Sequence, residues 1–217
     1  MELPAPPVLL ITDRRQTGRL LEVVVAGALR GGCRWISLRE KDLPAKDQAA
    51  LALRLCRLAA PFGARIMLHG DPRIAREAGL FGVHLPTRGD VQAARAALGH
   101  TAWVSTSAHS CDELLAVTAA GADAVTLSPI FASASKPGYG PALGLEMLAE
   151  SARRSPIPLI ALGGIADDSG VRACLEAGAA GVAVMGVIMR AADPAATMAK
   201  LTRAAGRGLV PSAPPAG

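Results

Sequence analysis

Charged side chains that directly follow short apolar runs are the first candidates for chemistry in this sequence. Residues 37–43 read SLREKDL and place Arg39 and Lys41 on either side of Glu40. A guanidinium makes two parallel hydrogen bonds to a phosphate, and an ammonium group acts as a point charge. We expect Arg39 and Lys41 to clamp a phosphate, with an ordinary salt-bridged strand end as the alternative interpretation.

A second candidate group combines hydroxyl groups with an imidazole. Residues 105–110 read STSAHS and contain Ser107, His109 and Ser110. His109 could transfer a proton near neutral pH, because an unperturbed imidazole titrates in that range. A single histidine is more often a capping or hydrogen-bonded structural residue, so both interpretations stay open. We expect His84, in GVHL, to be a structural residue facing inward or near the site.

Glycines in two later segments indicate an anion site built from backbone groups. The segments are ALGGIADDSG, with Gly163 and Gly164, and VAVMGVIMRA, with Gly186. Glycine lets backbone N–H groups approach a phosphate closely, and a following helix N-terminus favours negative charge. The same glycines also serve to turn the chain, which is the alternative reason for their presence.

A long stretch of small residues, SPIFASASKPGYGPALG, spans residues 128–144. Loops of this length are usually functional or disordered. Ser133, Ser135 and Lys136 form a hydroxyl and ammonium set, and the glycines that follow allow movement. We expect this segment to close over an anionic ligand; a tolerated surface insertion is the alternative.

A recurring joint predicts the elements that position these residues. Each of the segments ALRGGCRWISLRE, EAGLFGVHLPT, AAGADAVTLSP and EAGAAGVAVMG runs from an Ala-rich helix end through glycine into a short apolar strand. Nearly continuous apolar strands indicate a parallel sheet that is covered by helices on both faces. Counting these runs predicts eight strands, near Val8–Thr12, Trp35–Leu38, Arg65–Leu68, Gly82–Leu85, Ala102–Ser105, Ala124–Leu127, Leu159–Leu162 and Gly181–Met185.

Helical patterns lie between most of these strands. Examples are residues Lys46–Pro61, Val91–Leu98, Asp112–Ala120, Leu145–Arg154, Asp168–Ala177 and Pro194–Ala205. Eight strands that alternate with helices predict an α/β fold, a single (β/α)8 TIM barrel over residues 1–205. A doubly wound open sheet is the alternative, although no Gly-x-Gly-x-x-Gly follows the first strand. In a barrel the functional site lies at the carboxyl ends of the strands.

Composition narrows the function classes. A net charge of +5 with scattered acidic residues fits an anionic ligand or simply a soluble surface, and only 3% of residues are aromatic. Without a basic stripe interleaved with aromatics, we expect no nucleic-acid partner. No segment is long enough to span a membrane, and the N-terminus does not resemble a signal peptide, so we expect no membrane partner. The Pro-, Gly- and Ala-rich residues 206–217 are expected to form a disordered tail.

Cysteine usage indicates a reducing compartment. The four cysteines are widely separated and form no Cys-x-x-Cys pair or zinc-type cluster; they are Cys33, Cys56, Cys111 and Cys174. We expect buried, reduced thiols in a cytoplasmic protein.

An ordered series of short motifs resembles the thiamine phosphate synthase and thiazole tautomerase superfamily. The motifs are LLITD, SLREKDL, GVHL, STSAHS, SPIFASASKPG, IPLIALGGI and GVAVMGVI, spread from about residue 9 to residue 204. The resemblance implies a (β/α)8 barrel, small phosphorylated pyrimidine and thiazole substrates, and a role in thiamine biosynthesis. It is compatible with a homo-oligomer.

In the synthase branch, magnesium pyrophosphate leaves hydroxymethylpyrimidine diphosphate, and the nitrogen of a thiazole phosphate captures the resulting cation. The resemblance assigns the pyrophosphate to Arg39, Lys41 and Lys136, and places Ser107 beside the pyrimidine. Ser133 and Ser135 stand where the family usually has threonines facing the thiazole, and the thiazole phosphate would be held by Gly163 and Gly164. Such chemistry needs fixed positive charge more than a strong nucleophile.

Several positions depart from the synthase pattern. Ser37 replaces the usual glutamine that reads the pyrimidine, and Gly186 replaces the usual serine. His69 and Gly70 replace an Asn-Asp pair, and Gly89 replaces the second acidic metal ligand. Asp71 and Asp90 each lie one residue later. Because magnesium requires near-octahedral oxygen ligands, these shifted carboxylates are its candidate ligands only if the backbone also shifts.

These departures keep three hypotheses open. The first, which the retained cations and nearby aspartates favour, is a Mg²⁺-dependent synthase. The second is a metal-independent thiazole tautomerase, which aromatises a thiazole carboxylate phosphate and in which His109 matches the proton-transfer histidine. The third is a non-catalytic barrel that binds a thiazole phosphate.

Overall fold

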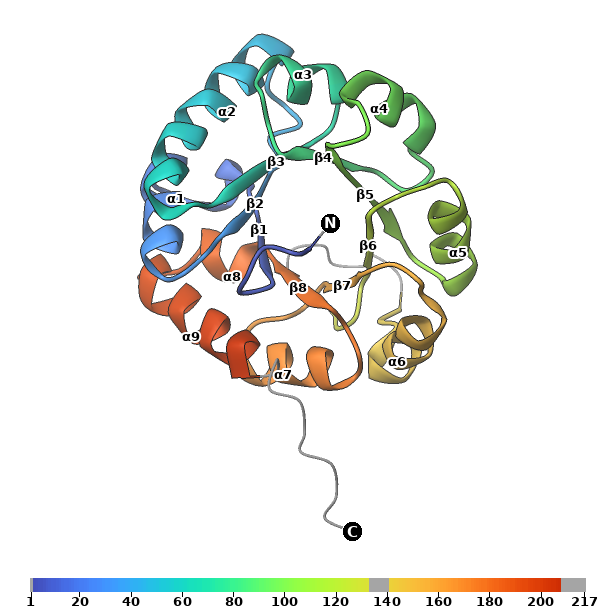
Figure 1. The fold of residues 1–217 in the computed structure, drawn as a ribbon. Helices are drawn as coiled ribbons and strands as arrows, with labels where there is room; N and C mark the ends of the chain where they lie inside the picture. The colour runs from blue at the N-terminus through green and yellow to red at the C-terminus, as the bar shows by residue number, and fades with distance from the viewer. Residues whose placement is uncertain (1, 133–140, 208–217) are drawn as a thin grey trace.

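Eight parallel strands close into a barrel in the computed structural model, which describes residues 2–132 and 141–207. Each strand pairs with the next along the chain, and the last pairs with the first in the register Val8 to Val182. Figure 1 views the barrel along its axis. This closure confirms the predicted (β/α)8 barrel and excludes the open doubly wound sheet. The strands are β1 (Val8–Ile11), β2 (Trp35–Leu38), β3 (Arg65–His69), β4 (Gly82–Leu85), β5 (Trp103–Ala108), β6 (Ala124–Leu127), β7 (Leu159–Leu162) and β8 (Gly181–Val184).

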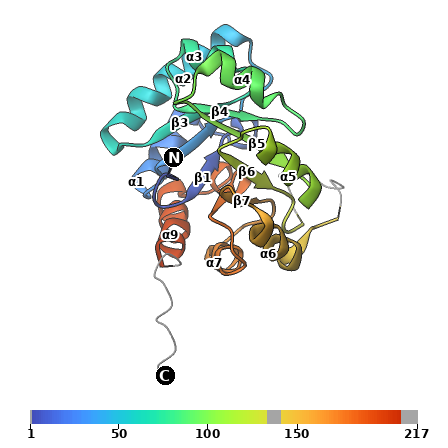
Figure 2. The same ribbon diagram turned by 45° about the vertical axis from the view of Figure 1, so that its right-hand side comes forward.

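Helices form the outer layer of the barrel (Figures 1 and 2). They follow the strands in the expected alternation, and β8 is followed by a short helix and then by the long C-terminal one, which packs on α1 and α7. The α-helices are α1 (Leu21–Arg30), α2 (Ala45–Ala59), α3 (Pro72–Glu77), α4 (Val91–Leu98), α5 (Cys111–Ala119), α6 (Gly144–Arg154), α7 (Asp168–Glu176), α8 (Gly186–Met189) and α9 (Pro194–Arg207). Two short 3-10 helices are η1 (Arg14–Gln16) and η2 (Ala60–Phe62).

The alternation of side chains along each strand divides the core into two parts. One set of strand residues packs outward against the helices, and with the aliphatic helix faces it forms the larger cluster. The other set fills the barrel interior, where Trp35 and Trp103 meet edge to face at 6.0 Å between ring centroids. Leu3 packs against this inner cluster, so the N-terminal segment covers the end of the barrel where the strands begin. The opposite end, where the strands finish, is therefore the face that can hold a site.

Strand β5 is longer than the sequence predicts. The apolar run stops near Ser105, yet pairing with β6 continues through Ser107 and Ala108. The strand can continue because its inward hydroxyl groups are satisfied inside the barrel: Ser105 and Ser107 both hydrogen-bond to the ring of His84. Buried polar groups with partners are tolerated within a sheet.

Some of the polar residues that follow the strands cap helices. Asp71, Asp90, Ser110 and Asp167 are N-caps, and each side chain accepts a hydrogen bond from a backbone N–H of the next helix. Such a cap stabilises a helix by about 1 kcal/mol. Helix capping therefore explains why polar residues occupy these four positions.

Two further sequence predictions concern composition. Cys33, Cys111 and Cys174 are buried as free cysteines, whereas Cys56 on α2 is half-buried.

Within residues 2–132 and 141–207, no helix combines the length and apolar character needed to cross a membrane. Helix α9 extends to Arg207, two residues past the predicted domain end, and residues 208–217 of the predicted tail lie outside the described residues.

Candidate anion-binding site at the barrel mouth

The carboxyl ends of β1, β2 and β8 surround a cationic cleft. These strands are neighbours, since β1 pairs with both β2 and β8. The cleft has a volume of about 730 Å³. Its lining consists of four cationic, two acidic and one amide side chain: Arg15, Arg39, Lys41, Arg190, Asp13, Asp42 and Gln16. Arg39 and Lys41 thus line the same cleft, and their role as a phosphate clamp stays a prediction.

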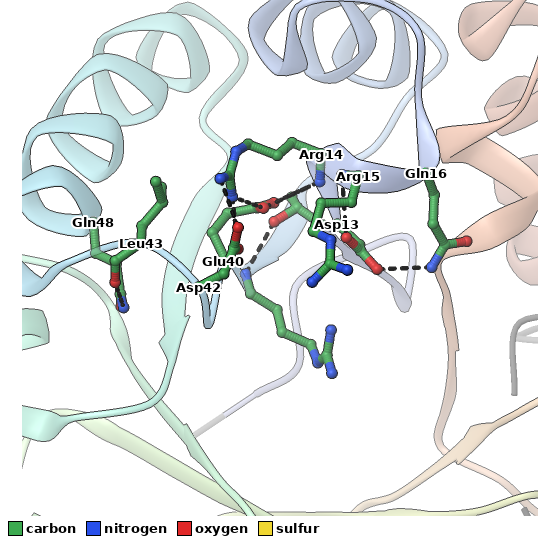
Figure 3. A network of polar contacts seen from close by, with 10 residues as sticks. Asp13, Arg14, Arg15, Gln16, Glu40, Asp42, Leu43 and Gln48 are labelled. Atoms are coloured by element: carbon green, nitrogen blue, oxygen red, sulfur yellow. Dashed lines mark hydrogen bonds and ion pairs between the residues drawn. The ribbon is translucent and has the colours of Figure 1, made fainter.

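A buried carboxylate holds the β1 and β2 loops together beside this cleft (Figure 3). Glu40 is 2% exposed, and its two oxygens accept hydrogen bonds from the backbone N–H of Arg14 at 3.0 and 3.1 Å. The Arg14 guanidinium adds a bond to Glu40 at 3.2 Å and two bonds to Asp42 at 2.7 Å each. The hydrogen bond to Asp42 raises the pKa of Arg14 and lowers that of Asp42. This network fixes the backbone that carries the cleft's cations.

Smaller hydrogen bonds complete the scaffold of the cleft. The buried hydroxyl of Thr12 accepts from the backbone N–H of Arg39 at 2.9 Å. Asp13 accepts from the backbone N–H of Arg15 at 3.2 Å and from the amide of Gln16 at 2.8 Å. The backbone N–H groups of Arg39 and Arg15 are therefore both tied to neighbouring side chains.

A second polar region lies inside the barrel, below the mouth. His84 is 3% exposed, and its Nδ1 and Nε2 lie 2.9 Å from the hydroxyls of Ser105 and Ser107. The ring of His69 lies 4.8 Å from that of His84. Burial, with a smaller contribution from the positive charge of Lys41, lowers the pKa of His84 to about 4. His84 is therefore neutral near pH 7, and its burial and two hydroxyl partners agree with the structural role that the sequence predicts.

Ser37 provides one buried hydroxyl without a partner in this inner region. Its Oγ atom is inaccessible to solvent, and no hydrogen bond to it is found within the described part of the chain. A buried polar group without a partner is costly, so a hydrogen-bonding group placed beside this hydroxyl would be stabilising.

His109 bridges three loops at the mouth. Its Nδ1 lies 2.8 Å from the backbone carbonyl of Ser128, and its Nε2 lies 2.9 Å from the hydroxyl of Thr87. Because a carbonyl only accepts, the neutral ring carries its proton on Nδ1 and accepts from Thr87. Its backbone N–H donates to Glu113 at 2.7 Å. The arrangement gives His109 a positioning role, and its assignment as a proton carrier remains a prediction.

Comparison with known proteins agrees with this fold. The family model described as thiamine monophosphate synthase matches residues 8–188. The chain belongs to the thiamine monophosphate synthase family. A Geobacter sulfurreducens protein provisionally named a thiamine-phosphate synthase is 43% identical over 187 residues, which cover 85% of this chain and 87% of that protein. The thiamine-phosphate synthase of Roseiflexus sp. (strain RS-1) is 37% identical, with 87% and 80% covered.

A solved structure supports the same membership of the thiamine monophosphate synthase family. The thiamine phosphate pyrophosphorylase from Pyrococcus furiosus superposes with a TM-score of 0.84 at 25% sequence identity. The superposition covers 93% of this chain and 96% of that one. The barrel therefore carries the family fold almost from end to end.

The predicted magnesium ligands of this family member have other functions in the structure. Both oxygens of Asp71 accept hydrogen bonds from the side chain of Arg73, at 3.0 to 3.3 Å, and one also caps α3. The side-chain hydrogen bond to Arg73 lowers the pKa of Asp71. Asp90 is exposed and accepts from the backbone N–H of Ala93 at 2.8 Å.

The backbone at Gly89, where the resemblance places the family's second acidic ligand, also excludes a carboxylate. A Cβ atom built on Gly89 would lie 2.6 Å from Cβ of Leu85. In the part of the chain that the structure describes, no group of three or more His, Cys, Asp or Glu side chains lies close enough together to hold a metal ion. With Asp71 engaged by an arginine, these donors do not fit a magnesium site of the family type.

Gly163 and Gly164 allow two loops to pack against each other. Both have positive φ angles, 103° and 69°. A Cβ on Gly163 would lie 2.8 Å from Cα of Pro129, and one on Gly164 would lie 2.5 Å from the carbonyl oxygen of Ala132. Phe131 also donates its backbone N–H to the carbonyl of Gly163 at 3.0 Å. The glycines are therefore required by the contact between the β6 and β7 loops, and their role toward a phosphate remains a prediction.

Other predicted residues have different outcomes. Gly186 is the first residue of α8 and is covered by the side chain of Arg190. Ser133, Ser135 and Lys136 lie outside the described residues. Sequence reasoning missed Arg15 and Arg190, which a search for cations just beyond β1 and β8 would have found.

Proposed function

We propose that this chain is a thiamine-phosphate synthase, which joins hydroxymethylpyrimidine diphosphate to a thiazole phosphate and releases pyrophosphate. The observation that carries the proposal is the cationic cleft at the ends of β1, β2 and β8, in a chain of the thiamine monophosphate synthase family. The thiamine-phosphate synthases of two Roseiflexus strains match this chain over 80% and 89% of their own length, which favours this activity over the tautomerase and the non-catalytic barrel.

The reaction begins with cleavage of one carbon–oxygen bond. The diphosphate leaves with the bonding electron pair, and the pyrimidine methylene carbon becomes a cation. The lone pair of the thiazole nitrogen then forms the new carbon–nitrogen bond. Charge develops mainly on the leaving group, so positive groups that are already in position lower the barrier.

Arg39 and Lys41 are the residues that we assign to the leaving diphosphate. Both line the cleft, and the loop that carries them is held by the buried carboxylate of Glu40. Because this scaffold is preorganised, the two cations need little rearrangement when the negative charge forms. Lys136 is proposed to join them from the β6 loop, on the basis of the family resemblance alone.

The inner polar region is the proposed site of the pyrimidine ring. Ser37 offers an unpartnered hydroxyl there, Ser107 is held in place by His84, and His69 lies alongside. A neutral His84 suits this place, because a buried imidazolium would oppose the pyrimidine cation that forms. We assign the thiazole phosphate to the loop of Gly163 and Gly164, with Gly186 and the Ser133–Ser135 segment nearby in the family scheme.

Three remaining predictions concern surroundings rather than chemistry. A cytoplasmic location is proposed from the free cysteines, and small phosphorylated substrates follow from the proposed reaction. We further propose that the chain binds neither nucleic acid nor membrane. The proposed synthase reaction is compatible with a homo-oligomer.

The test is to incubate the full chain with both substrates and follow product by chromatography. Replacing Lys41 by Gln removes one charge-stabilising donor, and we expect the rate to fall by a factor of about 100. The matched control is Lys200→Gln on α9, an exposed lysine outside the cleft, which should leave the rate unchanged. Aromatisation of the thiazole carboxylate phosphate in place of coupling would contradict the proposal and favour the tautomerase. Binding without either product would favour the non-catalytic barrel.

A further inference from the structure

Arg190 is a cation of the cleft that no sequence motif assigned. It lies just after α8, and its guanidinium covers the Cα atom of Gly186. A Cβ atom built on Gly186 would lie 2.7 Å from Cζ of Arg190, closer than real Cβ contacts occur. Any side chain at position 186 would therefore push the guanidinium out of its present place. Gly186, which replaces the family's usual serine, is therefore what allows Arg190 to occupy this position.

Arg190 is also linked to the β1 loop on the other side of the cleft. Its guanidinium donates to the side-chain oxygen of Gln16. The amide nitrogen of Gln16 in turn donates to Asp13 at 2.8 Å, and Asp13 caps η1. A chain of hydrogen bonds thus sets the position of Arg190 relative to Arg15, which projects from the same short helix.

The charge of the cleft points to an anionic ligand with more than one negative charge. Of the two carboxylates in the lining, Asp42 is bound on both oxygens by Arg14, a cation from outside the lining. The four lining cations therefore outweigh the remaining acidic charge. A cleft with one predominant sign of charge concentrates ligands of the opposite sign. Several arginines together suit the multiple oxygens of a diphosphate.

The residues expected to bind magnesium do not fit that ion, so a metal does not supply a second source of positive charge in the cleft. Glycines stand at positions 70 and 89, Asp71 is held on both oxygens by Arg73, and Asp90 caps a helix. Magnesium that binds a diphosphate is normally held through one or two protein carboxylates, and at the two positions where the family resemblance places them this chain has glycines. The chemistry of this donor set therefore leaves neutralisation of the diphosphate to the cleft.

We propose that Arg190 is a diphosphate-binding residue, and that with Arg15, Arg39 and Lys41 it neutralises the leaving pyrophosphate without a divalent cation. The inference rests on the proposed synthase function for the identity of the ligand. It goes beyond that function by assigning Arg190, by explaining Gly186, and by separating diphosphate binding from magnesium.

The experiment measures binding of inorganic pyrophosphate to the full chain by isothermal titration calorimetry, first in chelator and then with magnesium. We expect binding in chelator, with affinity reduced by about 10- to 100-fold in Arg190→Gln, because a hydrogen-bonded charge is lost. Gly186→Ser should weaken binding in the same direction, since it displaces the guanidinium while leaving its charge. The two changes combined should weaken binding little more than Arg190→Gln alone.

The matched control is Arg154→Gln. Arg154 lies at the C-terminal end of α6, on the opposite face of the barrel, in an exposed pair with Glu150. The Arg154→Gln substitution removes the same charge as Arg190→Gln, so an effect of net charge alone would appear in both variants. We expect the pyrophosphate affinity of Arg154→Gln to equal that of the unchanged protein. Circular dichroism of each variant shows whether the fold is retained, and Arg190→Gln remains informative if Gly186→Ser does not fold.

Several outcomes would overturn the inference. One is pyrophosphate binding that occurs only with magnesium, and another is an Arg190→Gln affinity equal to that of the control. The third is a thiazole phosphate that displaces pyrophosphate and whose own affinity falls by the same factor in Arg190→Gln. The last would assign the cleft to the other substrate. Failure of the proposed function gives a different pattern: pyrophosphate binds in chelator and depends on Arg190, yet no thiamine phosphate forms.

Discussion

Glu40→Gln tests whether one buried carboxylate builds the mouth of this barrel. Both Glu40 oxygens accept from the backbone N–H of Arg14, and one also accepts from its guanidinium. Glutamine keeps the shape of the side chain but replaces one acceptor oxygen by an NH₂ group. That donor would then face either the backbone N–H or the guanidinium, both of which are donors themselves.

The magnitude follows from these contacts. A hydrogen bond to a charged group contributes about 1.5–3 kcal/mol, and a buried donor without a partner costs about 1–3 kcal/mol. The variant loses one such bond and gains one such donor, while a neutral hydrogen bond to the remaining oxygen survives. We expect the free energy of unfolding to fall by about 2.5–6 kcal/mol, the sum of these two contributions. The exposed pair of Arg14 with Asp42 compensates little, because surface ion pairs contribute less than about 1 kcal/mol.

The assay is urea unfolding followed by tryptophan fluorescence, since Trp35 and Trp103 are both buried inside the barrel. The m value should stay constant while the midpoint shifts. The control is Glu22→Gln, the same chemical change in an exposed pair with Arg54, for which we expect a loss below about 0.5 kcal/mol. If Glu40→Gln cost no more than this control, the assignment of Glu40 as the scaffold of the mouth would be wrong.

Three further predictions concern the interior, a loop contact and a helix cap. The pKa of His84 is about 4 in the folded barrel, against about 6.5 in an unfolded chain, so the unfolded state binds the proton first as pH falls. The contribution of neutral His84 to the unfolding free energy should be complete above pH 6.5, and the unfolding free energy should fall by up to about 3 kcal/mol between pH 6.5 and 4. If the unfolding free energy of a His84→Asn variant fell equally steeply with pH, His84 would not be the cause. Gly164→Ala should cost about 2–4 kcal/mol through strain and the clash with Ala132, whereas Gly63→Ala, at a similar positive φ but with open space around it, should cost about 1 kcal/mol; equal losses would show that the clash is unimportant. Asp71→Ala should cost about 1 kcal/mol of thermal stability as a lost cap and leave pyrophosphate affinity in magnesium unchanged, and a magnesium-dependent drop in that affinity would restore the metal assignment.

The fold could be predicted from the sequence because its strands are short apolar runs that recur after glycine-ended helices. The same rule placed the end of β5 too early. Apolar character stops at Ser105, but Ser107 stays in the strand because His84, distant in sequence, satisfies its hydroxyl. A partner of this kind becomes visible only when the barrel has closed.

The site could be predicted in part. Arg39 and Lys41 were found because they follow a strand directly, and strand ends meet at the barrel mouth. Asp71 could not be judged in the same way, since a carboxylate just after a strand is equally suited to binding a metal or capping a helix. Arg190 was missed because it does not follow a strand directly: the short helix α8 lies between it and β8, and only the packing of its guanidinium over Gly186 brings it to the cleft.

The most direct test of the central claim is the stoichiometry of the products. The full chain is incubated with hydroxymethylpyrimidine diphosphate and a thiazole phosphate, and thiamine phosphate and pyrophosphate are quantified over time. A synthase should produce the two in equal molar amounts, with neither formed when one substrate is omitted. Pyrophosphate release without thiamine phosphate, or conversion of a thiazole substrate in the absence of the pyrimidine, would contradict the assignment.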